Sequence, residues 1–161
     1  MINFPQWLID SAIYIGLATF FLLALVLYNP RLMLQDYPPA IKAIVPPKTE
    51  IEKRQSLWLG MPFLLALLIL PFVFTFRLDE SSFFGLFLHT FGVIWAFNLW
   101  DWLILDWLVF CTLTPKQFVI PGSKGHPAYK DYAFHFRGFL IGTVFSLVMG
   151  LIVATAVYFI Q

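Results

Sequence analysis

The chain has 161 residues, of which 60% are apolar and 12% are charged, and its formal net charge is +1. A soluble domain has roughly 45–50% apolar and about 25% charged residues, so this composition excludes an ordinary soluble globule and predicts a membrane protein. The small net charge and the scattered basic residues exclude nucleic acid as a partner, and the single cysteine, Cys111, excludes an internal disulfide.

Two apolar runs in the first half are long enough to cross the hydrocarbon core, which takes about 20 helical residues. We expect these spans at 7–28 and 57–76. Pro30 ends the first run, because proline lacks the N–H that would continue a helix. Pro71 lies inside the second run, where we expect it to kink the helix.

The segment 29–55 between these runs is charged and rich in proline, which predicts an aqueous loop. Within it, the apolar residues of 40–45 predict either a short helix lying on the membrane surface or an irregular loop with a few buried aliphatic side chains.

Two further spans are expected at 82–113 and 134–160, separated by a second aqueous loop at 114–133. The link at 77–81 is so short that the second and third spans must be antiparallel neighbours. A helix over 82–113 would be roughly 48 Å long, against a core of ~30 Å, so its last part extends beyond the membrane. Asp131 is a plausible N-cap of the last helix. The sequence thus predicts an all-α, four-helix transmembrane bundle forming one domain.

The basic residues predict the orientation of this bundle. Nine of the ten Lys and Arg residues lie in or beside the loops 29–55 and 114–133, and the tenth is Arg77 in the short link. Because basic loops stay in the cytoplasm, we expect both long loops to be cytoplasmic and both termini to lie outside.

Polar side chains gather where the third span ends. Asn98, Asp101 and Asp106 form a broad polar arc if the helix is regular, and the following loop brings more polar residues to the same level. For acid–base catalysis the candidates are Asp101, Asp106 and His135. The candidates for ligand binding are Asn98, Tyr129, Lys130 and Arg137.

A divalent metal ion is the cofactor that this region would hold. Asp131 and His135 are four residues apart and share a helix face, so together with Asp101 they are candidate ligands. The alternative is that Asp101 or Asp106 only anchors the helix by pairing with a basic residue, namely Arg137, Lys53 or Arg54.

His89 is the polar residue expected deepest in the membrane. Such a side chain either donates a structural hydrogen bond to a neighbouring helix or handles a proton, a metal or haem. A bis-histidine haem is disfavoured, because His126 and His135 are expected at a different level. Asp10 is expected at the outer interface rather than inside the membrane.

Small residues recur every four positions along the last span, at Gly138, Gly142, Ser146, Gly150 and Ala154. This small-xxx-small pattern lets another helix approach closely. It predicts packing within the bundle or, alternatively, contact with a second copy or with another membrane protein.

Three functions remain open. The first is a site in the cytoplasmic leaflet that binds or acts on a lipid headgroup or an amphipathic small molecule, with membrane lipids as partners. The second is a small proton- or cation-coupled transporter that works as a dimer and uses His89 and Asp101. The third is an accessory subunit of a membrane complex, without chemistry of its own.

Overall fold

The computed structural model describes residues 3–80 and 82–161, which are 84% helical and contain no strand. Four of its helices are long and apolar enough to cross a membrane. These are α1 (Phe4–Tyr28), α3 (Glu50–Phe76), α4 (Phe83–Trp100) continued by η2 (Asp101–Leu113), and α5 (Tyr132–Ile160). The four expected spans are confirmed as apolar helices, and their number and length indicate a membrane-spanning protein.

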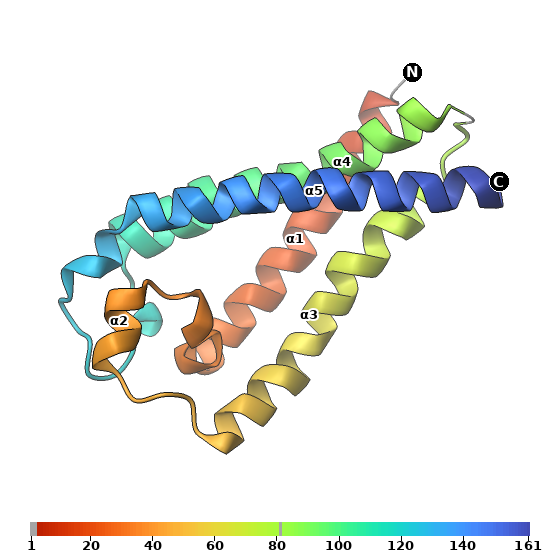
Figure 1. Ribbon diagram of the computed structural model, residues 1–161. Coiled ribbons are helices and arrows are strands. Elements are labelled where there is room, and N and C mark those ends of the chain that lie inside the picture. Colours follow the sequence, from red (N-terminus) through yellow and green to blue (C-terminus); the bar gives the residue numbers. More distant parts are fainter. Residues whose placement is uncertain (1–2, 81) are drawn as a thin grey trace.

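The helices form two pairs that meet near the chain termini and diverge towards the other end (Figure 1). One pair is α1 with α3, and the other is α5 with α4 and its continuation η2. Four short helices occupy the diverging end: η1 (Pro30–Asp36), α2 (Pro39–Ile44), η3 (Lys116–Phe118) and η4 (Pro127–Lys130). We call residues 29–49 and 114–131 the cap.

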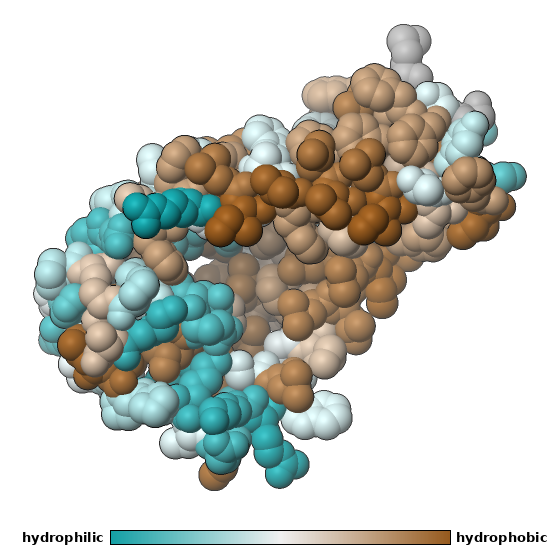
Figure 2. Space-filling model, in the orientation of Figure 1, coloured by the Kyte–Doolittle hydropathy of each residue, from teal (hydrophilic) through white to brown (hydrophobic). Residues whose placement is uncertain are grey.

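The cap has a hydrophobic core of its own, to which both long loops contribute. Tyr37 of the first loop donates a hydrogen bond of 2.8 Å to the carbonyl of Phe118 in the second. Ile41 of α2 is fully buried in this core, so α2 packs inside the cap and is not an irregular loop. The buried members are Val26, Leu34, Tyr37, Ile41, Val45, Phe110, Cys111, Phe118, Ile120 and Tyr129. Hydrophilic residues gather on the outside of this end, whereas the long helices present an apolar surface (Figure 2).

Helix α3 begins seven residues before the expected span. Thr49 and Glu52 form a capping box, in which the Glu52 N–H donates to Thr49 Oγ1 (3.2 Å) and the Thr49 N–H donates to Glu52 Oε2 (2.8 Å). The expected loop boundary at residue 55 was therefore wrong, because this cap satisfies the first turn and lets the helix start in its polar segment.

Pro71 inside α3 is compensated by a neighbouring helix. Because proline has no N–H, the carbonyl of Leu67, four residues earlier, loses its helical partner. The Tyr14 hydroxyl of α1 donates a hydrogen bond of 3.0 Å to this carbonyl. The contact of α3 with α4 is also direct, since Thr75 and Thr90 share a hydrogen bond of 2.7 Å between their hydroxyls.

The small residues of α5 lie largely against the neighbouring helix. A Cβ added to Gly142 would overlap the Asn98 side chain of α4, and one added to Gly150 would come within 3.1 Å of Phe91 Cβ. Ser146 and Ala154 are fully buried, whereas Gly138 meets open space. Gly142 and Gly150 thus lie against side chains of α4, and small-xxx-small packing, within the chain or with a second copy, stays a prediction.

Candidate functional site

The helix that carries the candidate site changes its winding at Asp101. It is α-helical to Trp100 and then becomes a π-helix, in which each N–H bonds to the carbonyl five residues earlier. The N–H of Thr114 donates to the carbonyl of Val109 in this way, at 2.9 Å. In a π-helix, residues five apart come close to one face, so Asp101 and Asp106 are brought nearer to each other than the expected α-helical arc would allow.

His135 of α5 is held by one of these carboxylates. Its Nδ1 lies 2.9 Å from Asp106 Oδ1, and its side chain is only 6% exposed. The Phe110 ring packs against the imidazole with ring centroids 4.8 Å apart. The second ring nitrogen, Nε2, is buried and has no hydrogen-bond partner among the described residues. Asp106 therefore orients the ring and leaves one nitrogen for another group.

Asp101 lies beside this pair without a partner of its own. Its carboxylate interacts electrostatically with Asp106 and with His135, but within residues 3–80 and 82–161 it forms no hydrogen bond or ion pair. The expected alternative, pairing of Asp101 or Asp106 with a basic side chain, is not what the structure shows, because the partner of Asp106 is His135.

Aromatic rings surround this end of the two helices. The Trp102 ring stacks on Phe139 at a centroid distance of 4.4 Å and touches Trp107 at 4.7 Å and Phe136 at 5.2 Å. The Trp102 indole N–H is buried and, in the described part of the chain, unpaired. After His135 Nε2, the Trp102 Nε1 atom is thus a second buried hydrogen-bonding atom at this end without a partner in the described residues, and it lies next to Asp101 in the sequence.

Three of the expected ligand-binding residues have structural roles. Asn98 Nδ2 donates to the carbonyl of Phe139 (3.0 Å) and so ties α4 to α5. The Tyr129 hydroxyl accepts a hydrogen bond of 2.8 Å from the N–H of Ile120 inside the cap core. Arg137, the fourth, is exposed at this end.

Lys130 closes the end of the π-helix. Its ammonium donates to the carbonyls of Cys111 and Thr112 and to the hydroxyl of Thr114. All three ammonium protons are used in this way, which stabilises the last turn of η2 and leaves none for a ligand.

The three expected metal ligands do not come together at one point. Asp131 is the N-cap of α5, as predicted, and its carboxylate accepts a hydrogen bond of 2.9 Å from the N–H of Phe134. Across residues 3–80 and 82–161, no three His, Cys, Asp or Glu side chains lie close enough together to hold a metal ion. The divalent ion expected at Asp101, Asp131 and His135 therefore has no three-ligand site in the described chain.

Asp36, at the end of η1, was missed in the sequence. Although its side chain remains exposed, partial desolvation raises the pKa of this carboxyl, and the negative charge of Asp106 raises it further, while Lys48 and Lys42 oppose the change. Asp36 also interacts electrostatically with Asp101. Asp36 lies 65 residues before Asp101, in a loop with many charged residues, so the sequence did not indicate that it would lie near Asp101 and Asp106.

A second polar cluster lies at the opposite end of the bundle. Asp10 of α1 is fully buried, forms an ion pair with Arg77, and lies 3.1 Å from His89 Nε2 through its Oδ2 atom. Gln6 Nε2 donates to its Oδ1 (2.9 Å). His89 thus contacts a carboxylate of a neighbouring helix, and Asp10, which was expected at the interface, is buried between helices.

Comparison with known proteins adds no relative to this description. No family model, curated protein or solved structure matches the chain.

Proposed function

We propose that this protein binds the polar headgroup of a lipid, or an amphipathic small molecule, at the cap end of the bundle and acts on it by acid–base catalysis, with His135 as the group that exchanges a proton. The observation that carries the proposal is the 2.9 Å contact between His135 Nδ1 and Asp106 Oδ1, beside an Nε2 atom that is buried and unpaired in the described residues. In a neutral imidazole this contact puts the proton on Nδ1 and leaves the Nε2 lone pair free to accept another.

The three residues have different roles in this proposal. His135 exchanges the proton with the ligand, and Asp106 is a positioning residue that holds the ring. Asp101, whose carboxylate has no partner in the described chain, accepts hydrogen bonds from hydroxyl or amine groups of the headgroup. Arg137 stays a candidate for a phosphate group of the same ligand.

The location of the site follows from the charges of the loops. We place the cap in the cytoplasm, because it and its flanking turns hold nine of the ten basic residues. Asp101 to Leu113 then lies where the hydrocarbon gives way to headgroups, and the tryptophans of this stretch suit that boundary because indole rings prefer the interface.

The test is conversion of lipid headgroups by reconstituted protein. Vesicles of phosphatidylethanolamine and phosphatidylglycerol are incubated with the protein, and their headgroup composition is followed by mass spectrometry. We expect His135→Gln and Asp101→Asn to lower the conversion roughly 100-fold or more, which is the usual contribution of a positioned acid–base group. Asp106→Asn should also change the pH profile of the remaining conversion.

The matched control is Asp79→Asn, which removes an exposed carboxylate from the short loop at the other end of the bundle. It should leave the conversion unchanged. The proposal is refuted if the wild-type protein leaves both lipids unaltered, or if neither the Asp101 nor the His135 substitution affects the conversion.

A second candidate function is proton- or cation-coupled transport by a dimer. It is favoured by the buried contact between Asp10 and His89, which together with Asp101 provides protonatable groups at both ends of the bundle. In vesicles carrying a pH gradient, proton flux reported by an internal dye should fall in His89→Gln. Equal flux in wild type and variant would reject transport through His89.

A further inference from the structure

A cavity of about 440 Å³ lies between α1, η1 and the first half of α3. This volume is within the range of roughly 300–1,000 Å³ that is typical of ligand pockets. The cavity is partly open, so an occupant can extend out of it into the surrounding bilayer.

The lining of the cavity changes from polar to apolar along α3. At one end are Gln35, Asp36, Lys48, Lys53 and Ser56. At the other end are Leu57, Gly60, Phe63 and Leu64, with Leu25 and Met33 opposite. The change falls at the start of the apolar run, next to Trp58, which is 70% exposed and suits a membrane interface. The cavity therefore spans the boundary between headgroups and hydrocarbon.

The polar end is electropositive and rigid. Its charged lining residues are Lys48, Lys53 and Asp36, which together carry a net positive charge. Lys53 also forms an exposed ion pair with Glu50 (2.7 Å), which uses one of its ammonium protons. The Lys48 ammonium is fixed by hydrogen bonds to the Leu32 carbonyl, to Gln35 and to the Ser56 hydroxyl (2.9 Å for the last). Desolvation lowers the pKa of Lys48 despite the nearby acids, so a further anion would stabilise its charged form.

We infer that this cavity holds a glycerophospholipid of the surrounding leaflet, with its phosphate hydrogen-bonded to Lys53 and attracted by the charge of Lys48, and with one acyl chain along Leu57, Phe63 and Leu64. A positive end beside an apolar channel matches this ligand, whereas a free anion would gain nothing from the leucines and a hydrocarbon nothing from the lysines.

This inference rests on the proposed function in one respect, since it names the lipid whose headgroup reaches the Asp101 site. Asp36 connects the two places, because it lines the cavity and interacts electrostatically with both Asp101 and Asp106. A headgroup extending past Asp36 would approach those two carboxylates.

The direct test fills the cavity. A Cβ at Gly60 meets no atom within 4 Å, so a leucine there can enter the cavity without disturbing the helix. Gly16 of α1 has equally open space but does not line the cavity, which makes Gly16→Leu the matched control. Phosphatidylglycerol binding to purified protein is measured by native mass spectrometry. We expect Gly60→Leu to weaken it roughly tenfold or more, and Gly16→Leu to leave it unchanged.

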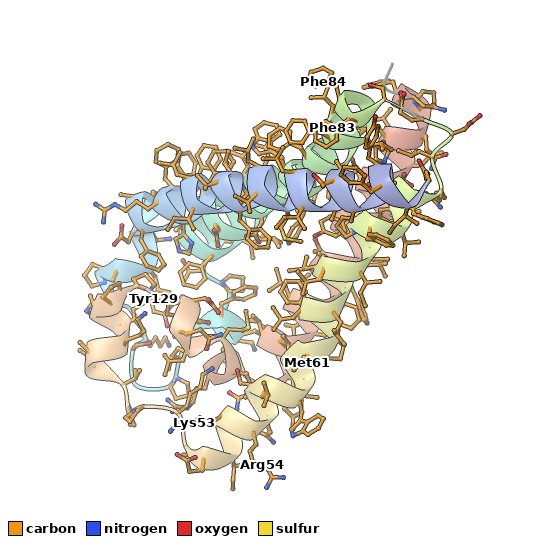
Figure 3. All side chains as sticks on the ribbon, turned by 45° about the vertical axis from the view of Figure 1, so that its right-hand side comes forward. Lys53, Arg54, Met61, Phe83, Phe84 and Tyr129 are labelled. Atoms are coloured by element: carbon orange, nitrogen blue, oxygen red, sulfur yellow. The ribbon has the colours of Figure 1, made fainter. Side chains whose placement is uncertain are left out.

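A second pair of variants tests the charge and does not depend on packing. Lys53 lines the cavity and Arg54, its exposed neighbour at the same end of α3, does not (Figure 3). Lys53→Glu should weaken phosphatidylglycerol binding about fivefold or more, whereas Arg54→Glu should change it by less than about twofold. Diacylglycerol should bind weakly, and inorganic phosphate should not displace the lipid.

The outcomes separate this inference from the proposed function. Equal lipid binding by wild type and Gly60→Leu, or diacylglycerol binding as tight as phosphatidylglycerol, overturns the lipid cavity. Displacement by inorganic phosphate overturns it in favour of a simple anion site. If Gly60→Leu weakens lipid binding while Asp101→Asn and His135→Gln leave the conversion unchanged, the proposed function is refuted and the lipid cavity stands.

Discussion

The ion pair between Asp10 and Arg77 predicts an asymmetry between two substitutions that break it. Asp10 is 0% exposed, whereas the Arg77 side chain is 45% exposed. In Asp10→Asn the guanidinium loses its counter-charge but can turn into water. In Arg77→Gln the carboxylate stays buried, and its remaining partners among residues 3–80 and 82–161 are Gln6 and His89.

The magnitudes follow from this difference in exposure. Leaving one charge of a buried pair unpaired costs about 3–5 kcal/mol, whereas an exposed pair is worth about 0–1 kcal/mol. We place Arg77→Gln at the lower end of the first range, about 3 kcal/mol, because His89 still lies beside the carboxylate. We expect Asp10→Asn to cost about 1 kcal/mol, since the amide oxygen can still accept a hydrogen bond. The double variant should return close to the Asp10→Asn value.

The assay is reversible unfolding in mixed micelles by titration with sodium dodecyl sulfate, followed by far-UV circular dichroism. Arg137→Gln is the control, because this arginine is exposed and takes part in no ion pair of the described chain. The reasoning is refuted if Asp10→Asn lowers the free energy of unfolding as much as Arg77→Gln does, or if the two losses simply add in the double variant.

Two further predictions concern the other end of the molecule. Gly142→Leu should lower the thermal midpoint in detergent and cost about 1–3 kcal/mol of stability, because a side chain there overlaps Asn98. Gly138→Leu meets open space and should leave the midpoint nearly unchanged. Equal midpoints of the two variants would show that α5 is not packed as described. Asp36→Asn should stabilise the protein at neutral pH, because the pKa of Asp36 is raised in the folded state. The stability contributed by the protonated carboxyl is fully present below its ordinary pKa of 3.8 and is lost as the pH rises through the higher folded value. When stability is measured against pH, the advantage of the variant over the wild type should therefore vanish below pH 3.8, and an advantage that is constant with pH would contradict the assignment.

The spans could be predicted from the sequence because hydropathy is a local property. Apolar runs of more than 20 residues require a helix wherever they lie, and the bounds agreed at most ends. The start of α3 differed because a capping box at Thr49 can begin a helix in polar sequence, and window hydropathy does not detect it.

The site was only partly predictable. Asp101, Asp106 and His135 were identified from their polarity at the end of apolar runs, and their proximity follows from the antiparallel helices. The pairing of His135 with Asp106 depends on the change from α to π winding. This change alters the direction in which Asp106 points from the helix axis, and a prediction that assumes a regular α-helix does not include it. Asp36 joins them only because the cap folds.

The same limit applies to the contact between Asp10 and His89. The two residues are 79 positions apart, and each alone is an isolated polar residue in an apolar run. Hydropathy gives neither the rotation of each helix about its axis nor its neighbour, and both are needed to bring a carboxylate to an imidazole.

The two-loop construction of the cap has a consequence for biosynthesis. The hairpin of α1 and α3 leaves the ribosome before the second long loop has been made, so the core around Tyr37 and Ile41 stays incomplete until Phe118 and Tyr129 follow. The first hairpin must therefore wait in the membrane with half of an apolar core uncovered, and closure of the cap adds to the contacts that α1 and α3 make with α4. A nascent chain arrested before Phe118 should be cleaved by protease within η1 and α2, at sites that the complete chain protects.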